Sequence, residues 1–345
     1  MAANTCFTVL LYVFSAWYSF QEQCLHREQE AAAYIFERYE NAWCLTDGNE
    51  TIRDPYDDPE ELQRGFSRWR YGCTYTPIVD VFVPSTSLDL NSWNQILSFR
   101  YLEELSLRDC QLDPDVDFSG YRYLQDLEIA GTALSLRQVR SIAKLTQLEK
   151  LSLDEASDDW LRYIGRLNNL RVLVISGGDF SDDGIAKLGD LKRLRGLGLG
   201  GTRFTSKSAS WISKCKDLEW MCLAGTKIDD EGVKQLTGLA ELKVLRLDDT
   251  QITDSCLASL AQLPNLEDLW LTNTNVTDAG IRKLAERKRL RNLDLSGTHV
   301  TNASVPVLAG LPLLKPSKYS VKNTKIDEAG LKQWQAARAS SPQEK

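Results

Sequence analysis

The chain has 345 residues, of which 43% are hydrophobic and 26% charged, and its formal net charge at pH 7 is −7. This composition is typical of a globular protein, and the acidic balance argues against a nucleic-acid-binding surface, which needs a basic stripe. Its eight cysteines include no Cys-x-x-Cys pair, which excludes zinc-finger and thioredoxin-like classes, and their density is too low for a disulfide scaffold.

Residues 1–21 are an apolar segment that we expect to be a transmembrane anchor or a signal-like segment. The 19 residues from Ala2 to Phe20 carry no charge, and at about 1.5 Å per residue they are just long enough to cross a hydrocarbon core of about 30 Å. A cleavable signal peptide and a buried helix are the competing interpretations. Arg27 and Arg38 follow the segment and favour cytoplasmic repeats by the positive-inside rule.

Residues 22–76 are predicted to form a juxtamembrane helix, an acidic linker and an N-terminal cap. Apolar residues recur at helical spacing up to Trp43, which predicts an amphipathic helix over residues 22–43. A second, short helix should place Phe66 and Trp69 over the open end of the first repeat, because an uncovered terminal repeat would expose core. Cys44 and Cys73 lie in this region near the start of the repeats, and the sequence leaves open whether they are bonded.

Residues 77–337 are a repeat array. Between Leu242 and Val300 the order Leu-x-x-Leu-x-Leu, Thr, Ile or Val, then Thr-Asp or Thr-Asn returns every 24 positions. In that frame eleven repeats begin at Ile78, Leu102, Leu124, Leu148, Leu170, Leu194, Leu218, Leu242, Leu266, Leu290 and Pro316. Each repeat predicts a short strand with its leucines inward, followed by a short helix capped by Thr or Asp. Residues 338–345 are expected to be a disordered tail.

Stacking such units gives an α/β solenoid with a parallel sheet on its concave side and short helices on its convex side. Threonines recur at one position of the repeat, where each strand turns out of the sheet. We expect their hydroxyls to point inward and to satisfy backbone groups there. The members of this column are Thr86, Thr132, Thr202, Thr226, Thr250, Thr274, Thr298 and Thr324.

The pattern Leu-x-x-Leu-x-Leu-x-x-Thr-x-x-Thr-Asp-x-Gly-Ile resembles the leucine-rich repeats, and in particular the Thr-Asp-Ala-Gly-Leu variety of membrane-anchored proteins in planctomycete-type bacteria. The resemblance implies a horseshoe-shaped, non-enzymatic interaction scaffold with a single-pass N-terminal anchor and extracytoplasmic repeats, opposite to the side that Arg27 and Arg38 favour. A more distant resemblance to the repeats of ubiquitin-ligase adaptors, where Cys often takes the place of Thr as Cys110 does, implies a soluble adaptor or substrate-recognition subunit as the alternative.

Enzyme and cofactor signals are weak. Gly196, Gly198 and Gly201 match a dinucleotide fingerprint, but the frame places the first two at outward positions of a strand and not at a strand-to-helix turn. The two histidines, His26 and His299, are too far apart in sequence to form a local metal or catalytic motif. We therefore expect no catalytic residue, no metal and no small-molecule cofactor.

Seven acidic residues cluster in the fourth and fifth repeats. A calcium site or a site for a cationic partner is one interpretation, but the spacing of a calcium loop is missing, and we favour solvated turns and helix caps. The residues concerned are Asp154, Glu155, Asp158, Asp159, Asp179, Asp182 and Asp183. Of the cysteines in the repeats, the frame places Cys110, Cys215 and Cys256 in buried positions.

The third and fifth positions of Leu-x-x-Leu-x-Leu point out of the sheet, and in the central repeats they are unexpectedly apolar. We predict that they bind a protein or peptide partner, because exposed apolar patches mark interaction sites. The predicted binding residues are Val172, Val174, Trp220, Cys222, Val244, Arg246, Asp268 and Trp270. Gly196 and Gly198 should leave a dent beside Trp220, and Arg246 and Asp268 should pair. The alternative is that these side chains pack on one another, or beneath the N-terminal helix, without a ligand.

Overall fold

The computed structural model describes residues 43–46, 51–52, 78–84, 87–99, 101–317 and 320–339. The chain divides into two compact units, Met1–Leu148 and Glu149–Lys345. The predicted anchor, the helix up to residue 42, the cap residues Phe66 and Trp69, and Cys73 lie outside the described residues. Within the ranges described, no helix is long and apolar enough to span a bilayer.

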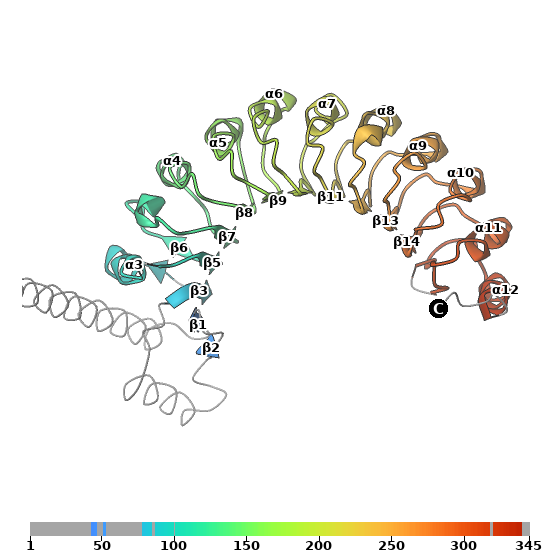
Figure 1. Cartoon of the computed structure of the whole chain (residues 1–345), viewed down its shortest axis with the longest axis horizontal. Helices are drawn as coiled ribbons and strands as arrows, with labels where there is room; N and C mark the ends of the chain where they lie inside the picture. The colour runs from blue at the N-terminus through green and yellow to red at the C-terminus, as the bar shows by residue number, and fades with distance from the viewer. Residues whose placement is uncertain are drawn as a thin grey trace, which may run out of the picture. The chain divides into compact units, whose positions relative to one another are not determined.

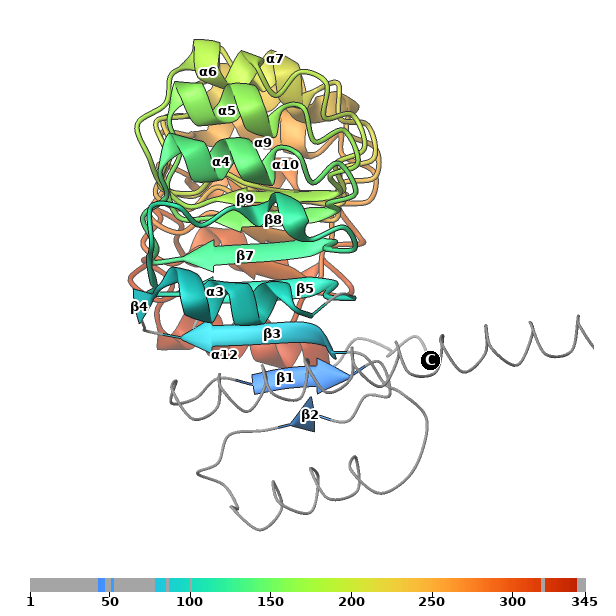
Figure 2. The ribbon, with the colours of Figure 1, turned by 90° about the vertical axis from the view of Figure 1, so that its left-hand side faces the viewer.

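The first unit contains a sheet in which parallel strands follow an antiparallel pair. Its strands are β1 (Trp43–Thr46), β2 (Thr51–Ile52), β3 (Ile78–Pro84), β5 (Glu104–Arg108) and β7 (Asp126–Ala130). β3, β5 and β7 are parallel neighbours, whereas β1 runs antiparallel to both β3 and β2; Figure 2 shows the arrow of β1 pointing opposite to that of β3. The prediction that the N-terminal helix includes Trp43 is therefore wrong, because the backbone there pairs with the first repeat strand.

Short helices and a second small sheet complete the first unit. They are β4 (Ser87–Leu88), α3 (Leu90–Leu97), β6 (Gln111–Leu112), the 3₁₀ helix η1 (Phe118–Gly120) and α4 (Leu136–Ile142). Trp93 of α3 is the centre of their core, with its ring edge-on to Phe118 at 4.8 Å and to Tyr121 at 5.6 Å between centroids. Large aromatic side chains thus fill the space that short helices leave.

The second unit is a regular solenoid of parallel strands. They are β8 (Lys150–Leu153), β9 (Val172–Ile175), β10 (Gly196–Gly198), β11 (Trp220–Cys222), β12 (Val244–Arg246), β13 (Asp268–Trp270) and β14 (Asn292–Asp294). Every strand pairs with the next without a register shift, so that Leu197, Met221 and Leu245 are direct neighbours. Figure 1 shows these strands along the inner side of the unit's curve.

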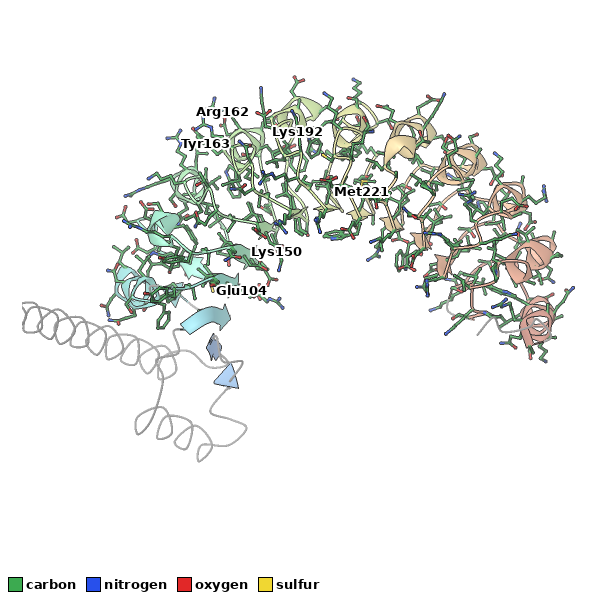
Figure 3. The ribbon with its side chains drawn as sticks, in the orientation of Figure 1. Glu104, Lys150, Arg162, Tyr163, Lys192 and Met221 are labelled. Carbon is green, nitrogen blue, oxygen red and sulfur yellow. The ribbon has the colours of Figure 1, made fainter. Side chains whose placement is uncertain are left out.

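The helices of the second unit lie along the outer side of the same curve (Figure 1). They are α5 (Asp158–Ile164), α6 (Asp182–Ala186), α7 (Ala209–Ile212), α8 (Asp230–Lys234), η2 (Gln235–Gly238), α9 (Asp254–Leu260), α10 (Asp278–Lys283), η3 (Asn302–Ser304), α11 (Val305–Ala309) and α12 (Glu328–Ala339). The labelled Arg162 and Tyr163 lie on this outer side, and Met221 lies between the strand and helix layers (Figure 3).

The predicted frame fits the described strands. The ten repeats that begin between Ile78 and Leu290 each carry a strand, and the inward leucines such as Leu245 and Leu247 are fully buried. The described residues of the eleventh repeat form no strand, but the carbonyls of Ser320 and Lys322 accept hydrogen bonds from Leu295 and Gly297 at 2.7 and 2.8 Å. Arg338 belongs to α12. The predicted start of the disordered tail is therefore wrong, and residues 340–345 lie outside the described part.

The predicted role of the threonine column is confirmed at six of its eight positions; Thr132 donates instead to the carbonyl two residues earlier, and Thr86 lies outside the described residues. In each of six repeats the hydroxyl donates to the carbonyl three residues earlier, at 2.6 or 2.7 Å. The threonines are Thr202, Thr226, Thr250, Thr274, Thr298 and Thr324. The residue before each has a left-handed backbone with φ between 54° and 70°, which is why that position holds only Gly, Asn or Asp. The sequence carried this second column, and we had not identified it.

The Thr-Asp pairs Thr253-Asp254 and Thr277-Asp278 each link their repeat to both neighbours. Thr277 caps α10 by accepting from the Ala279 amide, and its own hydroxyl and amide donate to Asp254 of the preceding repeat at 2.6 and 2.7 Å. A Cβ at Gly280 would overlap that same carboxylate. The motif Thr-Asp-x-Gly therefore has a physical meaning: Thr caps, Asp holds the next repeat, and Gly makes room for the Asp of the repeat before.

Candidate functional site

The strand side of the second unit presents two rows of outward side chains. We call the side chains of these rows on β9–β13 the central face. The register places Val172, Gly196, Trp220, Val244 and Asp268 in one row. It places Val174, Gly198, Cys222, Arg246 and Trp270 in the other. All eight predicted binding residues therefore lie within this set of five adjacent strands, on β9, β11, β12 and β13.

Trp220 does not stand beside a dent. A Cβ at Gly196 would overlap the indole ring of Trp220, so the ring occupies the space above this glycine on the neighbouring strand. Gly196 and Gly198 are themselves buried. The expectation of a hollow was wrong because the bulky side chain of one strand fills the space that the glycines of the next leave open.

The apolar members of the central face stay partly exposed. Trp220, Cys222 and Val244 each have intermediate exposure, as do Trp270 and the two valines of β9. Inward residues on the same strands, such as Met221 and Leu245, have none. The outward side chains thus pack against one another along the sheet without being covered by any described part of the chain.

Arg246 pairs with a residue that we had not predicted. Its Nε donates to Asp248 Oδ2 at 3.0 Å, and its guanidinium lies 5.7 Å from the centre of the Trp270 ring. The expected Arg246–Asp268 pair is wrong, because the register sets Arg246 beside Trp270 and Asp268 beside Val244. Asp248 is only 5% exposed and also accepts from the Thr272 amide. It fixes Arg246, which in turn orients Trp270.

Asp268 and Asp294 form the far edge of this surface. Asp268 accepts from the Asn292 amide group at 2.7 Å, and Asp294 accepts from the Ser296 backbone N–H at 2.9 Å. Neither carboxylate forms an ion pair with any residue that the structure describes. Asp294 is the neighbour of Trp270 on the next strand. Asp294 thus lies beside Trp270 on the side away from Arg246, and Asp268 lies two residues before Trp270 on β13.

A row of paired charges lies at the start of the same strands. Glu219 binds Lys243 at 2.8 Å and Arg195 at 3.7 Å. The hydrogen bond from Lys243, followed by its charge, lowers the pKa of Glu219. The pairs Arg171–Glu149 and Arg291–Glu267 continue the row. These exposed pairs cancel one another's charge and contribute little to stability.

The acidic cluster of the fourth and fifth repeats is used in helix capping and repeat stacking. Asp158 accepts from the Ser181 amide and hydroxyl, both at 2.7 Å, and Asp182 accepts from the hydroxyls of Thr205 and Ser208. Asp179 pairs with Arg203 at 2.7 Å. Across the described ranges no group of three or more His, Cys, Asp or Glu side chains is arranged to hold a metal ion.

The described cysteines of the repeats divide as the frame predicts. Cys110, Cys215 and Cys256 are buried and Cys222 is partly exposed. Burial, with a smaller contribution from the charge of Asp217, raises the pKa of Cys215 to about 11. Cys222 is therefore the thiol of the described repeats that solvent reaches.

Comparisons with known proteins agree with the repeat geometry. A family model described as a leucine-rich repeat matches residues 166–189. No curated protein matches the chain. An internalin from Listeria monocytogenes superposes with a TM-score of 0.56 at 19% sequence identity, over 79% of this chain and 84% of that chain. A leucine-rich repeat protein of Leptospira interrogans reaches a TM-score of 0.43 at 17% identity, over 76% of this chain and 89% of that chain.

The family model and the internalin support the fold and say nothing of the planctomycete-type variety, which stays a prediction. At 19% identity the internalin shows a shared architecture alone. The structure itself has the features of this fold: strands that carry inward leucines, helices on the opposite side, and a polar turn that returns with each repeat. Sequence pattern, family model and superposed structure together show that the repeats have the leucine-rich-repeat fold.

Proposed function

We propose that the protein is a non-enzymatic interaction scaffold that binds a protein or peptide on the central face. Leucine-rich repeat solenoids commonly bind partners on the concave sheet surface. What carries the proposal for this chain is the partial exposure of Trp220, Trp270 and their apolar neighbours on adjacent strands. Aromatic side chains on an accessible, rigid surface are the usual centre of a binding site.

The contrast with the first unit supports this choice of surface. The outward positions of β5 and β7 are polar, with Glu104 and Ser106 on one strand and Asp126 and Glu128 on the next. Ser106 and Arg108 both donate to Glu128, at 2.9 Å each. That face is an ordinary solvated sheet surface, whereas the central face replaces such groups with valine, cysteine and tryptophan. The packing of Trp220 on Gly196 leaves part of the ring accessible, so internal packing does not remove the patch.

We also propose that the N-terminal segment anchors the protein in a membrane. The support is the uncharged apolar stretch from Ala2 to Phe20 and the resemblance to anchored repeat proteins. Membrane fractionation of the full-length protein tests this: an anchored protein stays with the membrane through carbonate extraction. A full-length protein found only in the soluble fraction would refute the anchor and favour the adaptor alternative.

The binding proposal is tested with the double variant Trp220→Ala/Trp270→Ala. Proximity labelling from the wild-type chain should mark partners that the double variant no longer marks. Trp160→Ala is the matched control, because Trp160 is also half-buried but belongs to α5 on the helix side. The melting temperature of each variant must be measured alongside. If labelling is unchanged in the folded double variant, the central face is not the binding site.

A further inference from the structure

The charge distribution around Trp270 points to the chemistry of the partner, provided that the central face is the binding surface as proposed above. We infer that the partner is an extended segment in which an apolar side chain and a lysine or arginine lie about four residues apart. The apolar side chain packs on Trp220 and its valine neighbours. The basic side chain lies against Trp270 between Asp268 and Asp294.

Among the described residues, the acidic end of the face has no counterion. Arg246 is the one cation at the outward positions of β12–β14, and Asp248 already accepts from its guanidinium. Asp268 and Asp294 hold only amide donors. A cationic side chain that approaches here meets two carboxylates that form no ion pair with any described residue, whereas an anionic one meets repulsion and an arginine that is already engaged.

The ring of Trp270 offers a flat surface between Arg246 and Asp294. Its row neighbours are Arg246 on one side and Asp294 on the other. Arg246 sits over the ring at 5.7 Å, which shows that the ring accepts a cation in this geometry. A partner guanidinium or ammonium on the Asp294 side would gain both a ring contact and a carboxylate.

The distance between β11 and β14 sets the spacing of the two partner side chains. β11, which carries Trp220, and β14, which carries Asp294, are three strands apart. At about 4.8 Å per strand this is about 14 Å, which an extended chain covers in about four residues at about 3.3 Å each. A segment that crosses the strands can therefore place an apolar anchor on Trp220 and a basic group at Asp294 without bending.

The test is selection of a displayed library of random 12-residue peptides on the full-length protein, with the double tryptophan variant as the negative bait. Enriched peptides should carry lysine or arginine about three to five residues from an aromatic or aliphatic residue. Their affinity should fall by roughly tenfold for Asp268→Asn/Asp294→Asn and should weaken with added salt. The matched control is Asp183→Asn/Glu231→Gln, which removes two exposed charges from the helices α6 and α8 and should leave affinity unchanged.

Two other results separate this inference from the binding proposal. Peptides that need both tryptophans but show no basic preference, or prefer acidic residues, would overturn the inference and leave the binding surface in place. Peptides that bind the double tryptophan variant equally well, or no enrichment over that bait, would overturn both.

Discussion

Asp278 provides the sharpest test of how the repeats are held together. Asp278 is the first residue of α10. Its carboxylate accepts hydrogen bonds from the Thr301 amide at 2.9 Å, from the Thr301 hydroxyl at 2.7 Å and from the hydroxyl of Ser304. All three donors belong to the following repeat, and Ser304 is fully buried. The substitution Asp278→Ala removes the acceptor from all three at once and leaves the Ser304 hydroxyl buried without this partner.

The expected cost is about 3 kcal/mol, from three hydrogen bonds at about 1 kcal/mol net each. Asp183→Ala is the control, because Asp183 also lies in the first turn of a helix but is exposed, and such a surface change should cost about 0.5 kcal/mol or less. Urea denaturation of both variants measures the difference, and hydrogen exchange should show the loss concentrated in the repeats around α10 and η3. Equal stabilities for the two variants would refute the inter-repeat role of the Thr-Asp motif.

The pH dependence follows from the same contacts. Burial of the Asp278 carboxyl raises its pKa, but the hydrogen bonds from Ser304 and Thr301 outweigh burial, and the pKa lies below its ordinary value. A lowered pKa in the folded state means that the contribution to stability is complete above the ordinary carboxyl value of about 3.9 and is lost as the pH falls through the folded-state value. The stability gap between wild type and Asp278→Ala should therefore narrow in acid.

Three further predictions concern single residues. Gly196→Ala should destabilise the fold by about 1–3 kcal/mol in urea denaturation, because the new methyl overlaps the ring of Trp220; an unchanged midpoint would show that the ring does not rest there. The hydrogen bond from Ser206 outweighs burial and lowers the pKa of Asp229. Asp229→Asn should therefore lose less unfolding free energy than the wild type as the pH falls below about 4. Equal losses in the two proteins would contradict this. In a maleimide reaction of the folded protein, Cys222 should be modified well before the buried cysteines of the repeats; modification at equal rates would mean that the repeats open.

The architecture could be predicted because each repeat encodes its own local structure. The alternation around Leu245 sets which side chains point inward, and the threonine at Thr250 bonds to a carbonyl three residues away within the same repeat. Such contacts follow from spacing alone. The frame also predicted the outward position of the eight proposed binding residues and the buried positions of three cysteines.

What could not be predicted depends on contacts between repeats. The position of the Trp220 ring over Gly196 depends on a rotamer, and the choice of Arg246 between Asp248 and Asp268 depends on the register of adjacent strands. Spacing along one chain gives the row of a residue but not the direction in which a long side chain turns. Trp43 was assigned to a helix because its apolar neighbours fit helical spacing, while pairing with β3 decided its conformation.

Photo-cross-linking from single positions tests the central claim, that the central face holds the partner, most directly. Benzoylphenylalanine is introduced in place of Cys222, on the central face, and separately in place of Lys234, which is exposed at the end of α8 on the helix side. Irradiation in cells should give a cross-linked product from position 222 that is absent from position 234 and is lost when Trp220→Ala/Trp270→Ala is added. A partner captured only from position 234, or captured from position 222 despite the two substitutions, would contradict the account.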